Sequence, residues 1–386
     1  MSQVQNGDQT IYTPLRVCFV LPGLHRVNRG AETAFEAVAN ELAKIKGCDV
    51  TLFGMGESNP ARNYQFIQVH GRPRERFERW PRMPFVRSEC SWEELSFMPG
   101  LARRYRPADF DVTVTCSFPY SNWFLRSRRT RGYRPPHLYV TQNGDWPCIA
   151  DSGEYRWFHC DGLVCTNPEY FERNKDRWNA VLIPNGVDPA RFHSGPGSRE
   201  KFGLPGDVKT VLMVSALIPS KRVLEGIEAV HGLAGVHLVI AGDGPLRAEV
   251  AKKGAELLPG RFSLLKLPRE DMPDLYRSVD SFLHMSLDEP SANSYIEALS
   301  SGLPIVTHDR AVTRWTLEDC GFLTDCTNHK RVAEEIQKAL SAFDSERVRR
   351  QSELVERRFT WKGIAAEYHR ILTALHQRRT TGAMPE

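Results

Sequence analysis

The sequence predicts an α/β fold made of two doubly wound domains, and three observations support this prediction. The chain has 386 residues, enough for two domains that each bury a core. Strand and helix patterns alternate in both halves, which is typical of parallel sheets covered by helices. A stretch rich in Pro, Gly and polar residues, at 184–205, separates the two patterns and predicts a linker.

The first half opens with an apolar run at 16–21, which predicts a buried strand. A loop containing Gly30 follows, and apolar residues on one face predict a helix over 31–46. Four later apolar runs predict further strands, at 50–53, 111–115, 137–141 and 162–165. Short buried strands separated by helices favour a parallel sheet that is covered on both faces.

The second half repeats this alternation and ends in an amphipathic pattern. Its predicted strands lie at 210–214, 236–240, 262–265, 281–283 and 304–307. The segment 359–375 predicts a final helix. Doubly wound domains bind ligands beyond the carboxyl ends of their strands, so two such domains facing one another imply a cleft between them.

The positive charge of the chain is modest but unevenly distributed. The formal net charge is +4, yet residues 72–134 contain fourteen Arg and no Lys against seven Asp plus Glu. Such a segment fits three interpretations: a solvated face, a site for an anionic membrane surface, or a site for a phosphate-bearing acceptor. Arg with adjacent aromatic residues suits the membrane surface and the acceptor. Nucleic acid also binds basic patches, but no recognised nucleic-acid-binding module accompanies this one.

Composition and termini favour a cytoplasmic protein, with peripheral contact at the inner face of the membrane as an open alternative. Apolar residues make up 41% and charged residues 25%, as in soluble globular proteins. No apolar run approaches the roughly 20 residues that span a bilayer, and the polar start lacks a signal-peptide core. The nine cysteines include no Cys-x-x-Cys pair, so we expect buried thiols rather than a zinc or disulfide framework.

The most informative motif is the segment 288–297, which contains Glu289 and Glu297 at a predicted loop-to-helix junction. Roughly 12 Å of helical rise separates the two carboxylates. If a turn near Pro290 opens the helix, the backbone amides of 291–293 form an anion site at its positive end. Carboxylates beside an anion site suit a nucleotide sugar, while solvated carboxylates on a helix face remain the alternative.

Three further motifs accompany this segment in a fixed order. They are the Pro-Asn-Gly-Val-Asp run at 184–188, the Lys221-Arg222 pair and the Gly-Asp-Gly-Pro turn at 242–245. Together the four motifs resemble those of the retaining glycosyltransferases of family 4, the group 1 glycosyl transferases, and the resemblance runs from about residue 16 to 375. It implies the GT-B fold, in which two Rossmann-like domains face one another across a cleft.

The resemblance also implies a division of the chain. Residues 1–190 would form an acceptor-binding domain and residues 191–358 a domain that binds the nucleotide-sugar donor. Residues 359–386 would form a helix that packs back on the first domain. A metal site is not expected: Asp109 and Asp111 have metal-motif spacing, but they stand at a strand entry, away from the carboxyl-end cleft.

The family roles transfer to this sequence residue by residue. Lys221 would offset the charge of the departing diphosphate, Glu289 would contact the donor sugar and Glu297 the ribose. Arg222 can replace an Arg that the family usually has five residues before Lys221, where this chain has Ala216. The implied donor site comprises Gly30, Lys221, Arg222, Gly242, Gly244, Glu289, Ser291, Ala292, Asn293 and Glu297. An architectural role remains open for the two glycines of the turn.

One substitution bears on catalysis. Asn143 stands where many relatives have a His that approaches the reacting sugar. The candidate catalytic residues are therefore Lys221, Glu289 and Asn143. Arg29, Asp145 and Trp146 are candidates on the acceptor side.

The resulting hypothesis is a retaining, metal-independent transfer of a sugar from a UDP- or GDP-linked donor to an alcohol or amine. The acceptor would be a small molecule, a saccharide or a lipid-linked compound. No cofactor is expected besides the nucleotide-sugar co-substrate, and no nucleic acid. A GT-B-fold epimerase or hydrolase and a non-catalytic protein that binds anionic surfaces remain alternatives, and the oligomeric state stays open.

Overall fold

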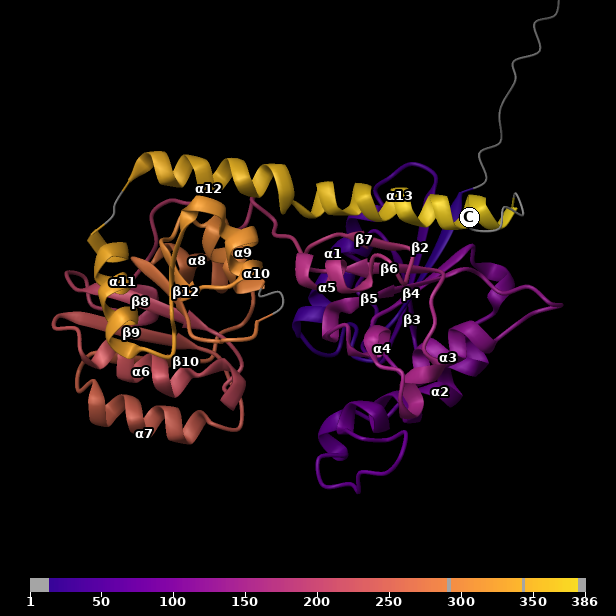
Figure 1. Cartoon of the computed structure of the whole chain (residues 1–386), viewed down its shortest axis with the longest axis horizontal. Coiled ribbons are helices and arrows are strands. Elements are labelled where there is room, and N and C mark those ends of the chain that lie inside the picture. Colours follow the sequence, from indigo (N-terminus) through magenta and orange to yellow (C-terminus); the bar gives the residue numbers. More distant parts are fainter. Residues whose placement is uncertain (1–13, 290–292, 342–343, 381–386) are drawn as a thin grey trace, which may run out of the picture. The chain divides into compact units, whose positions relative to one another are not determined.

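The computed structural model of the chain describes residues 14–289, 293–341 and 344–380. Contacts divide the chain into two compact units (Figure 1). Unit 1 comprises Met1–Val164, Asn174–Val181 and Ala365–Glu386, and unit 2 comprises Cys165–Arg173 and Leu182–Ile364. Each unit is built around one sheet with helices packed against it, which confirms the predicted fold class of two Rossmann-like domains.

The sheet of unit 1 has seven strands in the order β3-β2-β1-β4-β5-β6-β7. The strands are β1 (Leu15–Val20), β2 (Cys48–Gly54), β3 (Gln65–Gln68), β4 (Val112–Thr115), β5 (His137–Val140), β6 (Gly162–Cys165) and β7 (Ala180–Leu182). Strands β1 to β6 pair in parallel, and Val17 lies opposite both Val50 and Val112. The short edge strands β3 and β7 were not predicted: β3 has two apolar residues between two glutamines, and β7 is only three residues long.

The helices of unit 1 follow its strands. They are α1 (Gly30–Leu42), α2 (Glu89–Arg104), α3 (Tyr120–Ser127) and α4 (Trp146–Ile149), and α5 (Pro168–Asn174) lies where the chain passes between units. Helix α1 ends four residues before the predicted end at 46, with Ala43 as its C-cap. Its buried face includes Phe35, whose ring meets that of Phe19 at 5.3 Å between centroids.

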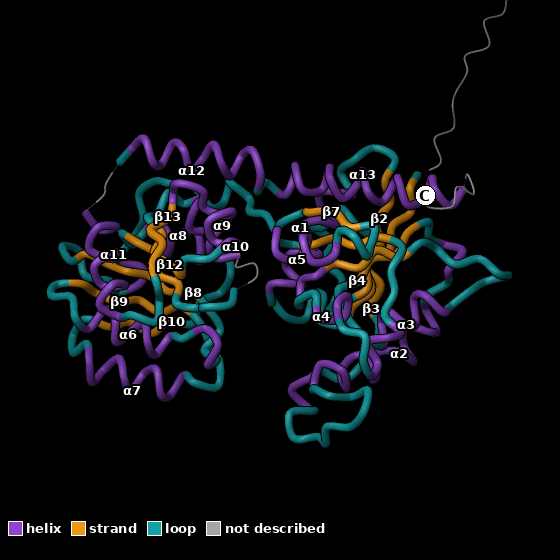
Figure 2. Tube along the Cα trace, viewed as in Figure 1, coloured by secondary structure: helices purple, strands orange, loops and turns teal. Residues whose placement is uncertain are grey.

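The sheet of unit 2 has six parallel strands in the order β10-β9-β8-β11-β12-β13 (Figure 2). The strands are β8 (Lys209–Val214), β9 (Val236–Ala241), β10 (Phe262–Leu265), β11 (Ser281–His284), β12 (Ile305–His308) and β13 (Gly321–Thr324). The helices are α6 (Val223–His231), α7 (Arg247–Leu257), α8 (Met272–Arg277), α9 (Asn293–Ser300), α10 (Ala311–Leu317), α11 (His329–Ser341) and α12 (Ser345–Arg358). Strand β13 was not predicted.

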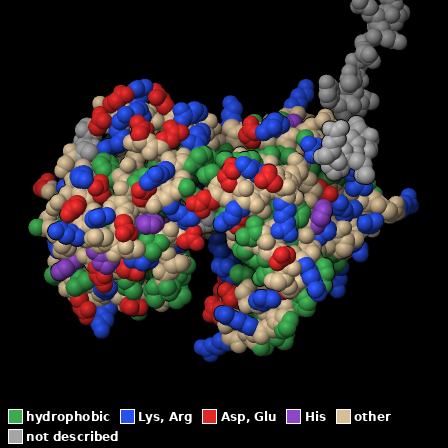
Figure 3. Space-filling model, viewed as in Figure 1, with side chains coloured by type: hydrophobic (Ala, Val, Ile, Leu, Met, Phe, Trp, Pro, Cys, Tyr) green, Lys and Arg blue, Asp and Glu red, His purple; other side chains and the backbone are tan. Residues whose placement is uncertain are grey.

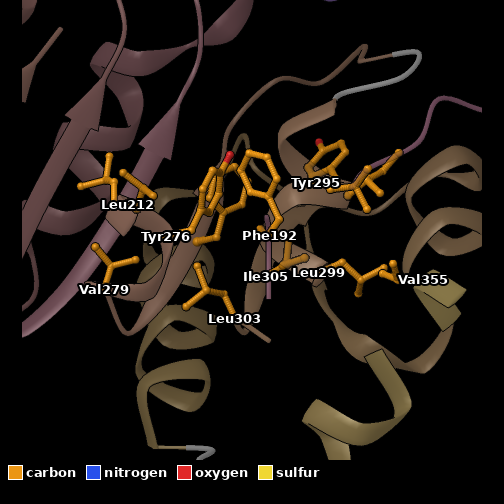
Figure 4. Packing of buried hydrophobic residues seen from close by; sticks show 14 of the residues in the cluster. Phe192, Leu212, Tyr276, Val279, Tyr295, Leu299, Leu303, Ile305 and Val355 are labelled. Carbon is orange, nitrogen blue, oxygen red and sulfur yellow. The ribbon is translucent and has the colours of Figure 1, made fainter. Parts of the chain in front are cut away.

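The two faces of this sheet pack against separate apolar clusters. Along β8, Leu212 belongs to one cluster, whereas Val211 and Met213 belong to the other, as the alternation of side chains in a strand requires. In the first cluster, Phe192 and Tyr276 meet edge to face at 5.7 Å between ring centroids (Figure 4). Each large apolar side chain that is fully buried in this way contributes roughly 1.5–3 kcal/mol to stability.

The last helix, α13 (Trp361–Thr380), begins in unit 2, and its residues from Ala365 onward belong to unit 1. Just before it, the chain pairs with the Pro-Asn-Gly-Val-Asp run: the Val187 amide donates to the Phe359 carbonyl at 2.7 Å. A side chain on Gly186 would lie 2.8 Å from the same carbonyl oxygen, so glycine permits this close backbone approach.

Candidate functional site

Three candidate residues of unit 2 lie in loops that follow the carboxyl ends of adjacent strands. Lys221 comes after β8, Gly242 directly after β9, and Glu289 after β11. Two residues that the sequence analysis did not single out, Arg269 after β10 and Arg310 after β12, occupy the same edge. This edge is where open parallel sheets bind their ligands.

Lys221 and Glu289 contact one another directly. The Lys221 ammonium forms an ion pair with the Glu289 carboxylate, and the two side chains are 24% and 9% exposed. A three-residue 3-10 turn, Pro219–Lys221, precedes Arg222, whose left-handed backbone (φ 52°, ψ 40°) starts α6. The turn thus places the lysine at the start of a helix, facing the loop after β11.

A buried histidine, His284, lies beside this ion pair. Its Nε2 is 3.8 Å from Glu289 Oε2, and its Nδ1 is 2.9 Å from the Tyr295 hydroxyl. Burial, with a smaller contribution from the Lys221 charge, lowers the pKa of His284 to about 3. The ring is therefore neutral at physiological pH. Sequence analysis did not single out His284, although it is the last residue of β11, four residues before the carboxylate motif at 288–297.

Glu297 is held by two partners on both oxygens. It lies on α9 and is 5% exposed. Arg269 Nη2 donates to Oε1 and the Tyr276 hydroxyl donates to Oε2, each at 3.0 Å. The pKa of Tyr276 is raised by burial and by Glu297. Neither partner was predicted; the position of Arg269 just after an apolar strand was the available signal.

The glycine turn after β9 packs against the loop after β8. A side chain on Gly242 would meet the Ser215 carbonyl oxygen at 2.0 Å, and one on Gly244 would meet the Leu217 carbonyl oxygen at 2.6 Å. The Leu217 amide also donates to the Asp243 carbonyl at 2.9 Å. Both glycines therefore have an architectural role, and Ala216 remains exposed in the loop between them and β8.

Arg222 and Asn293 are tied to backbone and side-chain partners. Arg222 Nη2 donates to the Cys326 carbonyl at 3.5 Å, and its Nε lies 3.7 Å from Glu225. At the start of α9, Asn293 accepts a hydrogen bond from Asn185 at 2.9 Å, which links the Pro-Asn-Gly-Val-Asp run to this helix. Ser291 and Ala292, the other two predicted residues of this loop, lie outside the described residues.

Arg310 joins two acidic residues near the same edge. Its guanidinium contacts Asp288 and Glu169, each at 2.6 Å. Asp288 immediately precedes Glu289, so this network fixes the backbone beside the first carboxylate of the motif.

In unit 1, Gly30 is the first residue of α1 and Arg29 is its N-cap. The Arg29 guanidinium lies 3.1 Å from Glu75 and 3.7 Å from Glu32. Burial lowers the pKa of Arg29, with the Arg74 charge adding to the effect. Arg29 is thus already engaged with carboxylates.

The other three candidates of unit 1 follow β5. Asn143 Nδ2 donates to the Cys116 carbonyl at 3.4 Å, and its own carbonyl accepts from the Trp146 indole at 3.2 Å. Asp145 is 4% exposed and accepts a hydrogen bond from Asn174 at 2.9 Å. Trp146 is 42% exposed. Of these three, Trp146 presents the largest surface to a ligand.

Sequence analysis missed a buried carboxylate, Glu94, beside the loop that follows β4. It lies on α2, is 4% exposed, and accepts a hydrogen bond from the Tyr120 amide at 3.1 Å. Burial raises the pKa of Glu94 to about 7. The apolar pattern of α2 gave no signal that Glu94, like its neighbour Glu93, is buried.

The described residues contain neither a cluster suited to a metal ion nor a helix suited to spanning a membrane. Across 14–289, 293–341 and 344–380, no group of three His, Cys, Asp or Glu side chains is arranged to hold a metal ion. In the same part of the chain, no helix combines the length and apolar character needed to cross a membrane.

Comparison with protein families places both halves of the chain. Residues 28–191 match the model "Glycosyltransferase Family 4", and residues 196–353 match "Glycosyl transferases group 1". Between them the two models span most of the chain.

Curated relatives are similar over part of their length. The lipopolysaccharide core biosynthesis glycosyltransferase LpsE of Rhizobium meliloti is 28% identical over 61% of this chain and 69% of its own. A GDP-mannose-dependent phosphatidylinositol dimannoside mannosyltransferase of Mycobacterium tuberculosis is 31% identical over 56% of this chain. This chain spans 58% of the length of that relative.

Solved structures match almost the whole chain at low identity. Sucrose-phosphate synthase from Thermosynechococcus elongatus aligns with a TM-score of 0.73 and 18% identity, covering 94% of this chain and 99% of that one. Anabaena Alr3699/HepE in complex with UDP-glucose aligns with a TM-score of 0.72 and 15% identity, covering 93% and 100%. These similarities establish the fold.

Proposed function

We propose, from the premise that this chain belongs to the family 4 and group 1 glycosyltransferases, that it moves a sugar from a nucleoside-diphosphate sugar to an alcohol or amine with retention of configuration. The observation that carries this proposal is the grouping of Lys221, Glu289 and Glu297 at the carboxyl edge of the unit 2 sheet. A point cation and two carboxylates suit a diphosphate flanked by two hydroxyl-bearing sugars.

Lys221 would act on the leaving group. The bond between the anomeric carbon and the diphosphate oxygen breaks, and a bond from the acceptor oxygen or nitrogen forms on the same face of the sugar. The acceptor proton passes to the departing phosphate oxygen, so no separate protein base is required. An ammonium beside the diphosphate stabilises the negative charge that develops as the bond breaks.

The ion pair between Lys221 and Glu289 gives this step a binding consequence. A bound diphosphate would compete with Glu289 for the ammonium, because both are anions. Glu289 would then be available to accept hydrogen bonds from the sugar hydroxyls. The ring of His284 lies 3.8 Å from Glu289 and is neutral, so it does not compete with the sugar hydroxyls for the carboxylate through a positive charge.

Glu297 would bind the ribose hydroxyls. Arg269 and Tyr276 contact its two oxygens and fix the orientation of the carboxylate. An ionised carboxylate has about four lone-pair sites, so acceptor capacity remains after two hydrogen bonds.

The donor is proposed to be a UDP- or GDP-linked sugar, because relatives of both kinds match this chain. One relative is named as GDP-mannose-dependent, and HepE was solved with UDP-glucose. We propose that Asn143 lies close to the reacting sugar and takes part in catalysis, and that Arg29, Asp145 and Trp146 lie on the acceptor side. The acceptor is proposed to be a small molecule, a saccharide or a lipid-linked compound; the mannosyltransferase compared above is named for a phosphatidylinositol dimannoside.

We further propose that transfer is independent of metal ions and that the protein works at the inner face of a membrane. Lys221 supplies the positive charge that a divalent ion provides in other transferases. Contact with the membrane is supported by the arginine-rich segment 72–134.

The first experiment measures thermal stabilisation of the protein by UDP, GDP and their sugars. A nucleotide at 100 times its dissociation constant should add about 2.7 kcal/mol to the free energy of unfolding. Product analysis by NMR then reports the anomeric configuration, and incubation of the donor without acceptor separates transfer from epimerisation or hydrolysis. Inversion of configuration would contradict the proposed course of the reaction.

A further inference from the structure

Unit 1 has a hollow of about 910 Å³ beside α3, lined mainly by aromatic side chains. Phe85, Tyr120, Trp123 and Trp157 form its walls. We call it the aromatic groove. The rings support one another: Trp157 lies 5.7 Å from Phe85 and 5.9 Å from Trp123 between centroids. These contacts form a preformed apolar surface rather than a set of independent side chains.

The groove lies in the part of the described chain that carries its exposed large apolar side chains. All large apolar side chains that are exposed in the described ranges lie between residues 80 and 157, and Trp157 is 46% exposed. Figure 3 shows hydrophobic side chains next to Lys and Arg over the region labelled α4 in Figure 1. Exposed aromatic residues beside arginines are typical of surfaces that meet lipid head groups.

The charge of the groove is positive. Arg126 and Arg156 belong to its lining, which contains no Asp or Glu. The Arg156 guanidinium lies 4.5 Å above the Trp157 ring, and Arg126 donates to the Trp157 carbonyl at 2.9 Å. Both cations are therefore fixed at the aromatic wall, where an anionic group attached to an apolar chain would meet them.

An unbroken series of rings connects the groove to the proposed acceptor residues. Trp123 lies 5.7 Å from Phe118, and Phe118 lies 6.0 Å from Trp146. The Trp146 indole in turn donates to the Asn143 carbonyl at 3.2 Å. Because Phe118 itself is buried, these rings form one packed cluster that ties the groove to the Asn143 loop, where Trp146 is exposed.

We propose that the acceptor is an anionic membrane lipid whose apolar chain lies in the aromatic groove and whose phosphate contacts Arg126 and Arg156. The proposal rests on the glycosyl transfer proposed above and specifies the class of its acceptor. The lipid is presented from a bilayer, and a hydroxyl of its head group receives the sugar near Asn143 and Trp146.

The test measures binding of the full chain to vesicles by fluorescence. Vesicles of phosphatidylcholine are compared with vesicles in which about a third of the lipid is phosphatidylglycerol with brominated chains. Bromine quenches tryptophan only at short range, so chains in the groove should quench the emission of Trp123 and Trp157. Replacing Trp123 or Trp157 by Phe should remove that residue's share of the quenching, and replacing both should remove most of it. Trp157→Ala should weaken binding to the vesicles roughly tenfold.

Two matched controls separate the groove from the rest of the surface. Trp80 is 45% exposed in the same unit but lies outside the groove lining, so Trp80→Ala should bind as the unaltered chain does. Arg156→Ala should weaken binding about fivefold, whereas Arg129→Ala, an exposed arginine outside the lining, should have a smaller effect.

Several outcomes would overturn the proposal. Equal binding to vesicles without phosphatidylglycerol would show that the anionic head group is not recognised. Equal losses of binding for Trp80→Ala and Trp157→Ala would show that the groove is not the binding site. If inorganic phosphate competed as strongly as the lipid, the apolar chain of the lipid would contribute nothing to binding. Nucleotide stabilisation of the unaltered protein is measured first. If nucleotides stabilise the protein but the lipid does not bind, only the proposed acceptor class is overturned. If nucleotides do not stabilise the protein, the result counts against the proposed glycosyl transfer itself.

Discussion

The Lys221 ammonium and the Glu289 carboxylate form an ion pair across 68 residues of sequence. The two side chains had been expected to bind different parts of the donor. Their pairing offsets one charge with the other, and it ties the loop after β8 to the loop after β11. A diphosphate would have to displace Glu289 from Lys221, which couples phosphate binding to the release of the carboxylate.

Lys221→Ala should weaken binding of a nucleoside diphosphate by about tenfold or more, because a hydrogen bond to a charged group is worth roughly 1.5–3 kcal/mol. Titration calorimetry with UDP and GDP measures the loss. Lys209→Ala is a matched control, since Lys209 is 59% exposed and pairs with Asp280. Equal affinity in the unaltered protein and Lys221→Ala would refute the phosphate role.

Glu289→Gln should lower sugar transfer and discrimination between donor sugars, while affinity for the free nucleoside diphosphate stays equal or rises. The amide keeps the size of the side chain but no longer neutralises Lys221, so the diphosphate meets less competition. Kinetics with several donor sugars and calorimetry with the free diphosphate measure the two effects. A fall in diphosphate affinity as large as that of Lys221→Ala would contradict the division of roles.

Glu297→Ala should weaken binding of ribonucleoside diphosphates by about tenfold and have little effect on 2′,3′-dideoxy analogues, which lack the hydroxyls that the carboxylate would accept from. Tyr276→Phe should give a smaller loss of the same kind, because it removes one hydrogen bond that orients Glu297. The difference between ribose and dideoxyribose affinities is the decisive measurement. Equal losses for both ligands would point to a structural role.

Turnover should survive exhaustive chelation with EDTA, since Lys221 provides the charge opposite the diphosphate. Activity is measured before and after chelation and again with added Mg²⁺ or Mn²⁺. Complete loss that a divalent ion restores would show that transfer depends on a metal.

Glu94→Gln should make the protein more stable at neutral pH. Burial raises the pKa of Glu94 from 4.5 to about 7, so folding favours the protonated form. Its stabilising contribution is fully present below pH 4.5 and is lost as the pH rises to about 7. Relative to the unaltered protein, the variant should gain about 3 kcal/mol across this window. Urea unfolding at several pH values measures the gain.

Glu89→Gln removes the same charge from the first turn of the same helix, where the side chain is only half buried. It therefore controls for net charge in the Glu94 experiment. An equal gain in both variants would contradict the assignment to burial.

The sequence by itself determined the fold class and the order of most elements. Apolar runs such as 236–240 stand out because a central parallel strand covered on both faces needs apolar residues at nearly every position. The edge strands β3 and β7 left a weaker signal, because β3 has two apolar residues between two glutamines and β7 is only three residues long. The order of the motifs was likewise sufficient to identify the family.

Only the tertiary structure decided which side chains meet. Lys221 reaches Glu289 because the neighbouring strands β8 and β11 bring their loops to one edge, although 68 residues separate the two in sequence. Arg269, from the loop after β10, reaches Glu297 on α9 at the same edge. The aromatic groove likewise gathers Phe85, Trp123 and Trp157 from three separate segments. Local sequence patterns record the periodicity of one element and the burial of its face. They carry no information on which side chains of other elements pack against it, so contacts of this kind depend on the folded chain.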